Sequence, residues 1–334
     1  MKRTLIIAEV GVNHNGDLDN AKKLIYEAVK CGADIVKFQT FKTEKLATPL
    51  AQKTAYQIKN TGKESLVQKD MLLKLELSDE DHIDLIKECK RNNIEFLSTA
   101  FDNESLRMLI KLGIKRIKIP SGEITNLPYL RLIGLSNLPI ILSTGMSNME
   151  EIDQAIKILT ENGRDKSSIT VLHCTSEYPA PFGSINLKAM NTIRNTFNVH
   201  VGYSDHTLGI EVPLAAVSLG AEIIEKHITL NRNQIGPDHK ASLEPCEFAK
   251  MVKGIRIVEE SLGNEIKKPS NKEEANSLLV RKSIVAAINI KLGEKFTKEN
   301  LTCKRPFNGL SPMNWDKLIG KKADRDYEKD EPIQ

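Results

Sequence analysis

The sequence predicts an α/β protein in which eight parallel strands alternate with helices and close into a (β/α)8 TIM barrel. Eight short apolar runs follow one another, at 5–11, 34–40, 94–101, 114–122, 139–146, 168–176, 199–205 and 221–230. Stretches with helical period lie between most of them, such as 20–32 and 149–163. This alternation is typical of a parallel sheet with crossover helices, and eight such units indicate a closed barrel.

The chain of 334 residues is long enough for a barrel of about 250 residues and a smaller second unit. The last barrel helix is expected at 245–262, so the barrel domain spans 1–262. Residues 263–277 are polar, contain Gly and Pro and have no apolar period, which predicts a linker. Residues 278–334 contain short β-like runs and predict a small β-rich domain that docks on a larger surface.

Charge, cysteine and hydropathy patterns exclude several classes of protein. The net charge is +4 with no long block of one sign, so we expect a small-molecule partner, with no nucleic acid and no membrane. The five cysteines form no C-x-x-C pair, which favours reduced thiols. Glu9 interrupts the first apolar run too early for a signal peptide, and no segment approaches the ~18 apolar residues of a membrane span. These patterns predict a cytoplasmic protein.

One connection is unusually long. Residues 41–78 separate the second strand from the next clear helix, and loops of this length in a compact domain are usually functional or disordered. Tyr56 and Ile58 give the segment side chains that can pack, so we expect a lid.

Polar side chains follow nearly every predicted strand. Because the carboxyl ends of barrel strands form one mouth, we expect a single pocket there. Its candidate residues are Glu9, Lys37, Gln39, Thr99, Lys118, Ser121, Glu123, Ser143, Ser204, His206 and His227.

His206 and His227 follow the seventh and eighth strands, and neighbouring strands lie about 4.8 Å apart, so the two imidazoles can share a metal ion. An octahedral ion that keeps several waters, manganese or magnesium, tolerates so few protein ligands better than structural zinc. Two hydrogen-bonded histidines at the barrel mouth are the alternative.

Lys37 and Lys118 lie among hydroxyl groups inside the predicted barrel, where a lysine is costly to bury unless it meets an anion. The pattern suits a phosphate or carboxylate ligand. Two alternatives stay open. One is internal ion pairs, Lys37 with Glu9 or Lys118 with Glu123, and the other is a Schiff-base lysine as in barrel aldolases. Glu9 and Glu123 are also candidates for acid–base catalysis.

The motifs AEVGVNHNGD, VKFQTFK, KIPSGEITNLPYL, LHCTSEYPAPF, GYSDHT, EKHITL, GPDHKAS and KRPFNGLSP occur in one order along the chain. Together they resemble the sialic acid (nonulosonate) synthase family. The histidine of LHCTSEYP and the segment YQIKNTG are most similar to the bacterial branch that makes N-acetylneuraminate or N,N'-diacetyllegionaminate, not to the pseudaminate branch.

The resemblance implies a barrel followed by a small antifreeze-like (SAF) domain, in a domain-swapped homodimer. It implies a divalent metal, manganese with magnesium or cobalt as alternatives, held by His206 and His227. Its implied phosphoenolpyruvate ligands are Lys37, Thr99, Lys118, Ser121, Ser143 and Ser204, and its implied acceptor-sugar ligands are Gln39, Ser176, Tyr178, Asp238 and, from the partner protomer, Arg305. Glu9 matches the residue that acts on the reacting centre. Ser176, Ala100 and Phe307 depart from the family pattern, and Ser176 stands where asparagine or another polar residue is common.

The implied reaction joins C3 of phosphoenolpyruvate to the C1 aldehyde of an N-acetylated hexosamine. The acceptor is 2,4-diacetamido-2,4,6-trideoxymannose or N-acetylmannosamine, and the metal polarises the aldehyde. Water then adds at C2 and phosphate leaves by C–O cleavage. A Schiff-base aldolase using Lys37 or Lys118 and, more remotely, a carbohydrate- or ice-binding module are the alternative functions.

Overall fold

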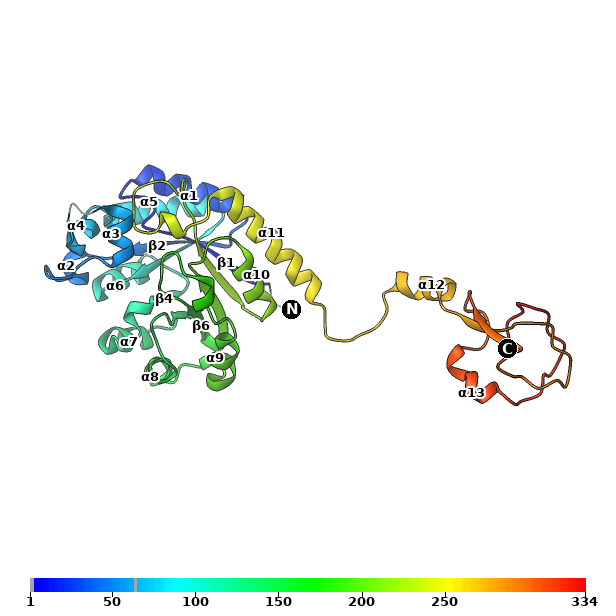
Figure 1. Ribbon diagram of the computed structural model, residues 1–334. Helices are drawn as coiled ribbons and strands as arrows, with labels where there is room; N and C mark the ends of the chain where they lie inside the picture. The colour runs from blue at the N-terminus through cyan, green and yellow to red at the C-terminus, as the bar shows by residue number, and fades with distance from the viewer. Residues whose placement is uncertain (1–2, 63–64) are drawn as a thin grey trace. The chain divides into compact units, whose positions relative to one another are not determined.

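A closed barrel of eight parallel strands forms the first part of the protein (Figure 1), in a computed structural model that describes residues 3–62 and 65–334. Each strand pairs with the next along the chain, and the last pairs with the first. The strands are β1 (Leu5–Gly11), β2 (Ile35–Thr40), β3 (Glu95–Ala100), β4 (Ile117–Ile119), β5 (Ile140–Ser143), β6 (Ile169–Cys174), β7 (His200–Asp205) and β8 (Ile223–His227). The predicted TIM barrel is confirmed.

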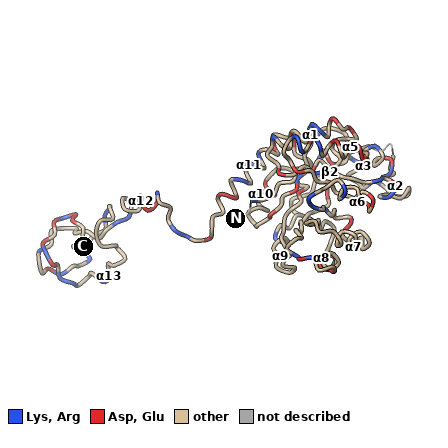
Figure 2. The backbone as a smooth tube through the Cα atoms, turned by 180° about the vertical axis from the view of Figure 1, so that it is seen from behind, with Lys and Arg blue, Asp and Glu red and all other residues tan. Residues whose placement is uncertain are grey.

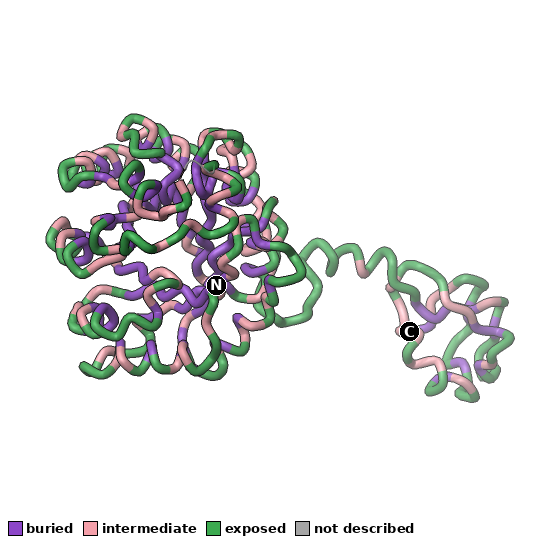
Figure 3. Tube along the Cα trace, turned by 60° about the vertical axis from the view of Figure 1, so that its left-hand side comes forward, coloured by how far each residue is buried: buried purple, intermediate pink, exposed green. Residues whose placement is uncertain are grey.

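Helices cover the outside of the barrel. They are α1 (Leu18–Lys30), α5 (Asp79–Arg91), α6 (Asn103–Lys111), α7 (Leu127–Gly134), α8 (Met149–Thr160), α9 (Ala189–Phe197), α10 (Glu211–Ser218) and α11 (Pro245–Leu262). The outward-facing Ile6 and Val10 of β1 share one buried core with Leu24 and Ile25 of α1. Figure 3 shows buried residues gathered in the interior of this unit and exposed residues along its outside.

The inside of the barrel has an apolar floor. Ile7, Ile35, Leu97, Ile141, Leu172 and Ile223 each come from a different strand and pack into one buried cluster. Because side chains alternate along a strand, the residue two positions later also points inward, nearer the carboxyl end. Those residues are Glu9, Lys37, Thr99, Ser143, Cys174 and Glu225. A polar layer therefore lies directly above the apolar floor.

The long connection predicted as a lid is largely helical where the structure describes it. It contains α2 (Thr43–Leu46), α3 (Ala55–Thr61) and α4 (Gln68–Leu73), and residues 63–64 lie outside the described ranges. Phe41, Met71 and Leu75 anchor it in a small apolar cluster. At Gly16, where φ is +75°, a Cβ would lie 2.2 Å from the carbonyl oxygen of Lys74. Glycine therefore lets the loop after β1 contact the end of this segment.

A second compact unit begins at Asn264. It contains α12 (Asn271–Val280), the antiparallel strands β9 (Ser283–Ala286) and β10 (Leu301–Lys304), and α13 (Trp315–Leu318). It has its own core, which includes Ile284, Phe296 and Tyr327. The second half of the segment predicted as a linker, 263–277, is helical, because α12 begins there with a capping box formed by Ser270 and Glu273.

Charged residues of both signs are interspersed along both units (Figure 2). None of the helices within 3–62 and 65–334 has the length and apolar content that a bilayer crossing requires.

Candidate active site

A cavity of about 280 Å³ is lined by residues from the carboxyl ends of the strands and from the lid. Twelve of the predicted site residues line it: Glu9, Lys37, Gln39, Thr99, Lys118, Ser121, Ser143, Ser176, Tyr178, Ser204, His206 and His227. Sequence reasoning missed Glu225, and it also missed the lid residues Thr54, Gln57 and Gln68 as lining groups. The predicted convergence of the strand ends on one pocket is therefore observed.

Glu225 is the centre of a buried charge cluster. Its Oε2 lies 2.7 Å from Lys37 Nζ and its Oε1 lies 3.5 Å from Lys118 Nζ. Ser204 Oγ donates a hydrogen bond of 2.9 Å to the same Oε1. Lys37 Nζ also lies 3.3 Å from Glu9 Oε2. Internal ion pairs of the lysines, one of the sequence-based alternatives, are thus present, but Lys118 pairs with Glu225 and not with Glu123.

Burial and neighbouring charges set the protonation of this cluster. Burial raises the pKa of Glu9 to about 8, with Lys37 opposing and Glu225 adding to the shift. Burial would also raise the pKa of Glu225, but Lys118 and Lys37 outweigh it and hold that pKa below its usual range. Burial lowers the pKa of Lys118 to about 8. Near neutral pH two ammonium groups therefore face one ionised carboxylate, which leaves the cluster positive and attractive to an anion.

Two hydroxyl groups line the same cavity as the lysines. Thr99 Oγ1 and Ser143 Oγ are both buried, and neither meets a partner within residues 3–62 and 65–334. A buried polar group without a partner is costly, so these two hydroxyl groups are suited to bind a polar ligand. Ser121 Oγ, by contrast, accepts a hydrogen bond of 2.9 Å from the Gly145 amide. Thr99, Ser143 and the two lysines are suited to the oxygens of a phosphate or carboxylate.

The two histidines lie side by side, with ring centroids 5.5 Å apart. His206 Nδ1 lies 2.7 Å from the carbonyl oxygen of Thr175, which can only accept, so Nδ1 carries the proton and Nε2 keeps its lone pair. Burial lowers the pKa of both imidazoles and keeps them neutral. His227 Nδ1 is buried without a partner in the described part of the chain.

This pair fits a divalent cation, because neutral imidazoles with free lone pairs are the form that ligates metals. Two protein ligands suit an ion that keeps several waters. The described residues contain no group of three or more His, Cys, Asp or Glu side chains that could hold a metal.

Aromatic rings connect the lid to the histidines. Tyr178 stacks on Tyr56 of α3 with ring centroids 4.9 Å apart, and it contacts the His206 ring at 4.1 Å. Tyr178 also meets His227 edge-on at 5.9 Å. The lid therefore contributes one side of the cavity, directly above the histidine pair.

Among the residues that the structure describes, three predicted site residues do not line the cavity: Glu123, Asp238 and Arg305. Glu123 falls in the short 3-10 turn Ser121–Glu123, and its Oε2 accepts a hydrogen bond of 2.5 Å from Asn126 Nδ2. Asp238 is buried near Tyr56, and burial raises its pKa to about 7. Arg305 is exposed and belongs to the C-terminal unit.

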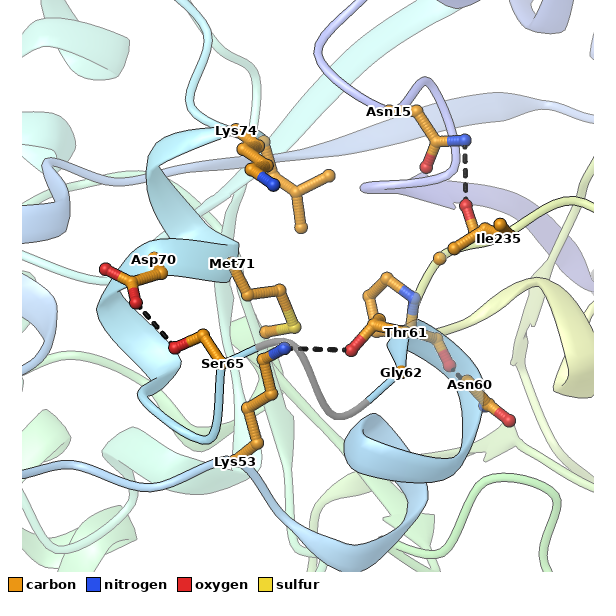
Figure 4. Close-up of a pocket in the computed structure, with 13 residues that line it drawn as sticks. Asn15, Lys53, Asn60, Thr61, Gly62, Ser65, Asp70, Met71, Lys74 and Ile235 are labelled. Atoms are coloured by element: carbon orange, nitrogen blue, oxygen red, sulfur yellow. Dashed lines mark hydrogen bonds between the residues drawn. The ribbon is translucent and has the colours of Figure 1, made fainter.

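A second cavity, of about 510 Å³, lies on the lid (Figure 4). Lys53, Asn60 and Thr61 line it, together with Ile235 of the loop after β8. Lys53 Nζ donates a hydrogen bond of 3.1 Å to Thr61 Oγ1, and Asn15 Nδ2 donates one of 3.1 Å to the Ile235 carbonyl. The candidate active site is the smaller cavity, because the histidines and the buried lysines line it.

Replacing His14 by asparagine is expected to reduce the acid sensitivity of the barrel. His14 is fully buried, and burial lowers its pKa from 6.5 to about 4. The unfolded chain binds the proton first, so the stability from His14 is complete above pH 6.5 and is lost as the pH falls toward 4. Between pH 7 and 5 this loss is about 2 kcal/mol.

Urea unfolding at the two pH values measures this difference. The free energy of unfolding should fall about 2 kcal/mol more in the wild type than in His14→Asn. The same loss in both proteins would contradict the assignment.

The fold and the cavity define a barrel enzyme, because a closed (β/α)8 barrel carries its active site at the carboxyl ends of its strands. The chain belongs to the NeuB family, whose model matches residues 24–267, and residues 281–334 match the SAF domain. The predicted family and C-terminal domain are confirmed.

Whole-chain relatives agree with this assignment. The chain is 54% identical to the N,N'-diacetyllegionaminic acid synthase of Campylobacter jejuni over 100% of both chains. It is 48% identical to the enzyme of that name from Legionella pneumophila, over 95% of this chain and 89% of the relative. A crystal structure of N-acetylneuraminic acid synthetase from Leptospira borgpetersenii in complex with citrate superposes with a TM-score of 0.73, at 35% identity over 82% of this chain and 90% of that chain.

Proposed function

We propose that this enzyme condenses phosphoenolpyruvate with an N-acetylated hexosamine aldehyde and water, giving a nonulosonic acid and phosphate. The observation that carries the proposal is the cavity itself. In it, Lys37, Lys118 and two buried hydroxyl groups without a partner among the described residues line one space with a pair of neutral imidazoles. The similarity to the two N,N'-diacetyllegionaminic acid synthases favours 2,4-diacetamido-2,4,6-trideoxymannose as the acceptor over N-acetylmannosamine, and hence N,N'-diacetyllegionaminate as the product.

Phosphoenolpyruvate would occupy the positive end of the cavity. Lys37 and Lys118 provide the charge for its phosphate and carboxylate, and Thr99 Oγ1 and Ser143 Oγ provide buried donors. Glu225 holds both ammonium groups in place before the substrate binds. Such prearranged charges act as electrostatic clamps on a substrate whose charge is redistributed during reaction.

The acceptor sugar would lie against Tyr178 and Gln39, with Ser176 at the same wall. Asp238 does not line the cavity, but it interacts with Tyr56, which does, so it would affect the acceptor site indirectly. Arg305, which is exposed, would complete the site of a partner protomer in a homodimer.

Bond formation joins C3 of phosphoenolpyruvate to C1 of the aldehyde, and the aldehyde oxygen becomes a hydroxyl. Water adds at C2, and the C2–O bond to phosphate breaks. Glu9 lines the cavity with a pKa of about 8, so it is protonated near neutral pH and suits a group that gives its proton to the aldehyde oxygen and regains one from this water. A bound manganese, magnesium or cobalt ion on His206 and His227 would supply Lewis-acid polarisation of the aldehyde.

The acceptor is tested by comparing phosphate release from phosphoenolpyruvate with three sugars. These are 2,4-diacetamido-2,4,6-trideoxymannose, N-acetylmannosamine and N-acetylmannosamine 6-phosphate. We expect the highest kcat/KM with the first. A preference for either of the others would overturn the acceptor assignment, and no phosphate release with any of them would overturn the function.

The bond that breaks is tested in water enriched in oxygen-18. C–O cleavage leaves the bridging oxygen on phosphorus, so the released phosphate should carry no label. Labelled phosphate would contradict the proposed reaction course. Borohydride reduction that attached substrate covalently to Lys37 or Lys118 would favour the Schiff-base alternative.

A further inference from the structure

Asp205 and Lys226 each stand one position before a histidine of the site, and they form an ion pair on the outer side of the barrel wall. Lys226 Nζ lies 2.5 Å from Asp205 Oδ2, and both side chains are fully buried. The register of β7 and β8 places the two residues directly opposite each other. Because side chains alternate along a strand, an outward Lys226 requires His227 to point into the barrel.

The network extends to the residue after His206. Lys226 Nζ also donates a hydrogen bond of 2.5 Å to the carbonyl oxygen of Thr207. Asp205 Oδ1 accepts one of 3.1 Å from the Thr207 amide, and Oδ2 accepts one of 3.0 Å from the Thr207 hydroxyl. The residues on both sides of His206 are therefore tied to one ammonium group, which is carried by the strand that ends in His227.

Other contacts hold the His206 ring itself. Its Nδ1 bonds to the Thr175 carbonyl, and its own carbonyl oxygen accepts a hydrogen bond of 2.9 Å from the Ala180 amide. Both contacts come from the chain after β6, and the first of them orients the ring. The network of Asp205, Thr207 and Lys226 instead fixes the backbone of His206 against β8.

Stability alone is a weak reason for this ion pair. Removing two charges completely from water is expensive, and well-packed apolar residues of similar volume often serve a fold equally well. The apolar core surrounds this wall of the barrel, with Tyr203 and Ile224 buried beside the pair in the same strands. The pair does, however, have a geometric consequence that an apolar pair lacks, since it bonds the backbone next to His206.

We propose that Lys226 is a positioning residue, which acts through Asp205 and Thr207 to set the separation of the His206 and His227 imidazoles for a divalent cation. The inference rests on the proposed metal role of these histidines. It predicts that Lys226 controls metal affinity although its side chain points away from the cavity. Supporting groups around metal ligands typically change affinity by about 10- to 100-fold when they are lost.

The test is a titration of the full-length enzyme with Mn²⁺, followed by electron paramagnetic resonance of the free ion. Lys226→Met should weaken the Kd for Mn²⁺ by about 10- to 100-fold. Lys226→Arg, which keeps the charge and the donors, should restore most of the affinity. The double variant Lys226→Met/Asp205→Leu removes both buried charges, so it should keep a near wild-type Tm in EDTA and still bind Mn²⁺ weakly.

Arg116→Met is the matched control. Arg116 Nε lies 2.7 Å from Glu95 Oε1, and this ion pair also joins neighbouring strands, but at the opposite end of the barrel. The variant should lower the Tm without changing the Kd for Mn²⁺. If the Kd followed the Tm in every variant, or if Lys226→Met bound Mn²⁺ as the wild type does, the positioning role would be wrong. A wild-type enzyme that bound no Mn²⁺ would overturn the proposed metal pair as well.

Discussion

Replacing Lys37 by methionine should reduce kcat/KM for phosphoenolpyruvate by about 10²- to 10³-fold. Lys37 is 3% exposed and is the cation shared by Glu9 and Glu225. Its loss removes a proposed ligand of the substrate anion and leaves Glu225 paired with Lys118, at 3.5 Å, and hydrogen-bonded to Ser204. Steady-state kinetics with phosphoenolpyruvate as the varied substrate measures the effect.

Lys42→Met is the control for this variant. Lys42 is also ion-paired, with Asp79 at 3.1 Å, but its side chain is 38% exposed and lies outside the cavity lining. Exposed pairs of this kind contribute little, so kcat/KM should stay within about twofold of the wild type. An equal loss in both variants would contradict the role given to Lys37.

The double variant Lys37→Met/Glu225→Gln separates catalysis from stability. In Lys37→Met, the buried carboxylate of Glu225 has lost one of its two lysine partners. The double variant also removes this carboxylate, so it should recover part of the free energy of unfolding. It does not restore the missing ammonium group, so kcat/KM should stay low. Recovery of activity together with stability would show that the lysine acts only on the fold.

The strand ends could be predicted because they depend on local patterns. Each apolar run marks a strand, and the polar residues that follow it reach the same mouth whatever the detailed packing is. Lys37, Thr99, Ser143 and the two histidines were found in this way, and the structure brings them together. Their partners depend on contacts across the barrel, which sequence spacing does not give.

Glu225 and Glu123 show this limit. An ion pair of Glu123 with Lys118 is one of the alternatives that the sequence leaves open, but Glu123 falls in a 3-10 turn after Pro120 and does not pair with Lys118. Glu225 comes from β8 and reaches lysines on β2 and β4. The motif EKH (225–227) nevertheless indicates that Glu225 points into the barrel, because the residue two positions before an inward histidine also points inward. Similarly, the capping box at Ser270 was visible within the segment predicted as a linker.

Replacing both His206 and His227 by alanine should abolish measurable Mn²⁺ binding and lower kcat by about 10³-fold, because a Lewis acid contributes several kcal/mol to such a step. Treating the wild type with EDTA should lower kcat to a similar level, and added Mn²⁺ should restore only the wild type. His200→Ala is the control, since His200 lies at the other end of β7 and bonds to Glu222. It should bind Mn²⁺ normally.

The KM values distinguish a metal role from general damage to the cavity. Lys37, Lys118 and the hydroxyl groups of Thr99 and Ser143 remain in the double histidine variant, so KM for phosphoenolpyruvate should change little while kcat falls. A collapsed cavity would raise KM as well, because the anion ligands would move with the strand ends. A double variant that kept full turnover after chelation would instead remove the metal from the reaction and leave His206 and His227 as hydrogen-bonded groups of the barrel mouth.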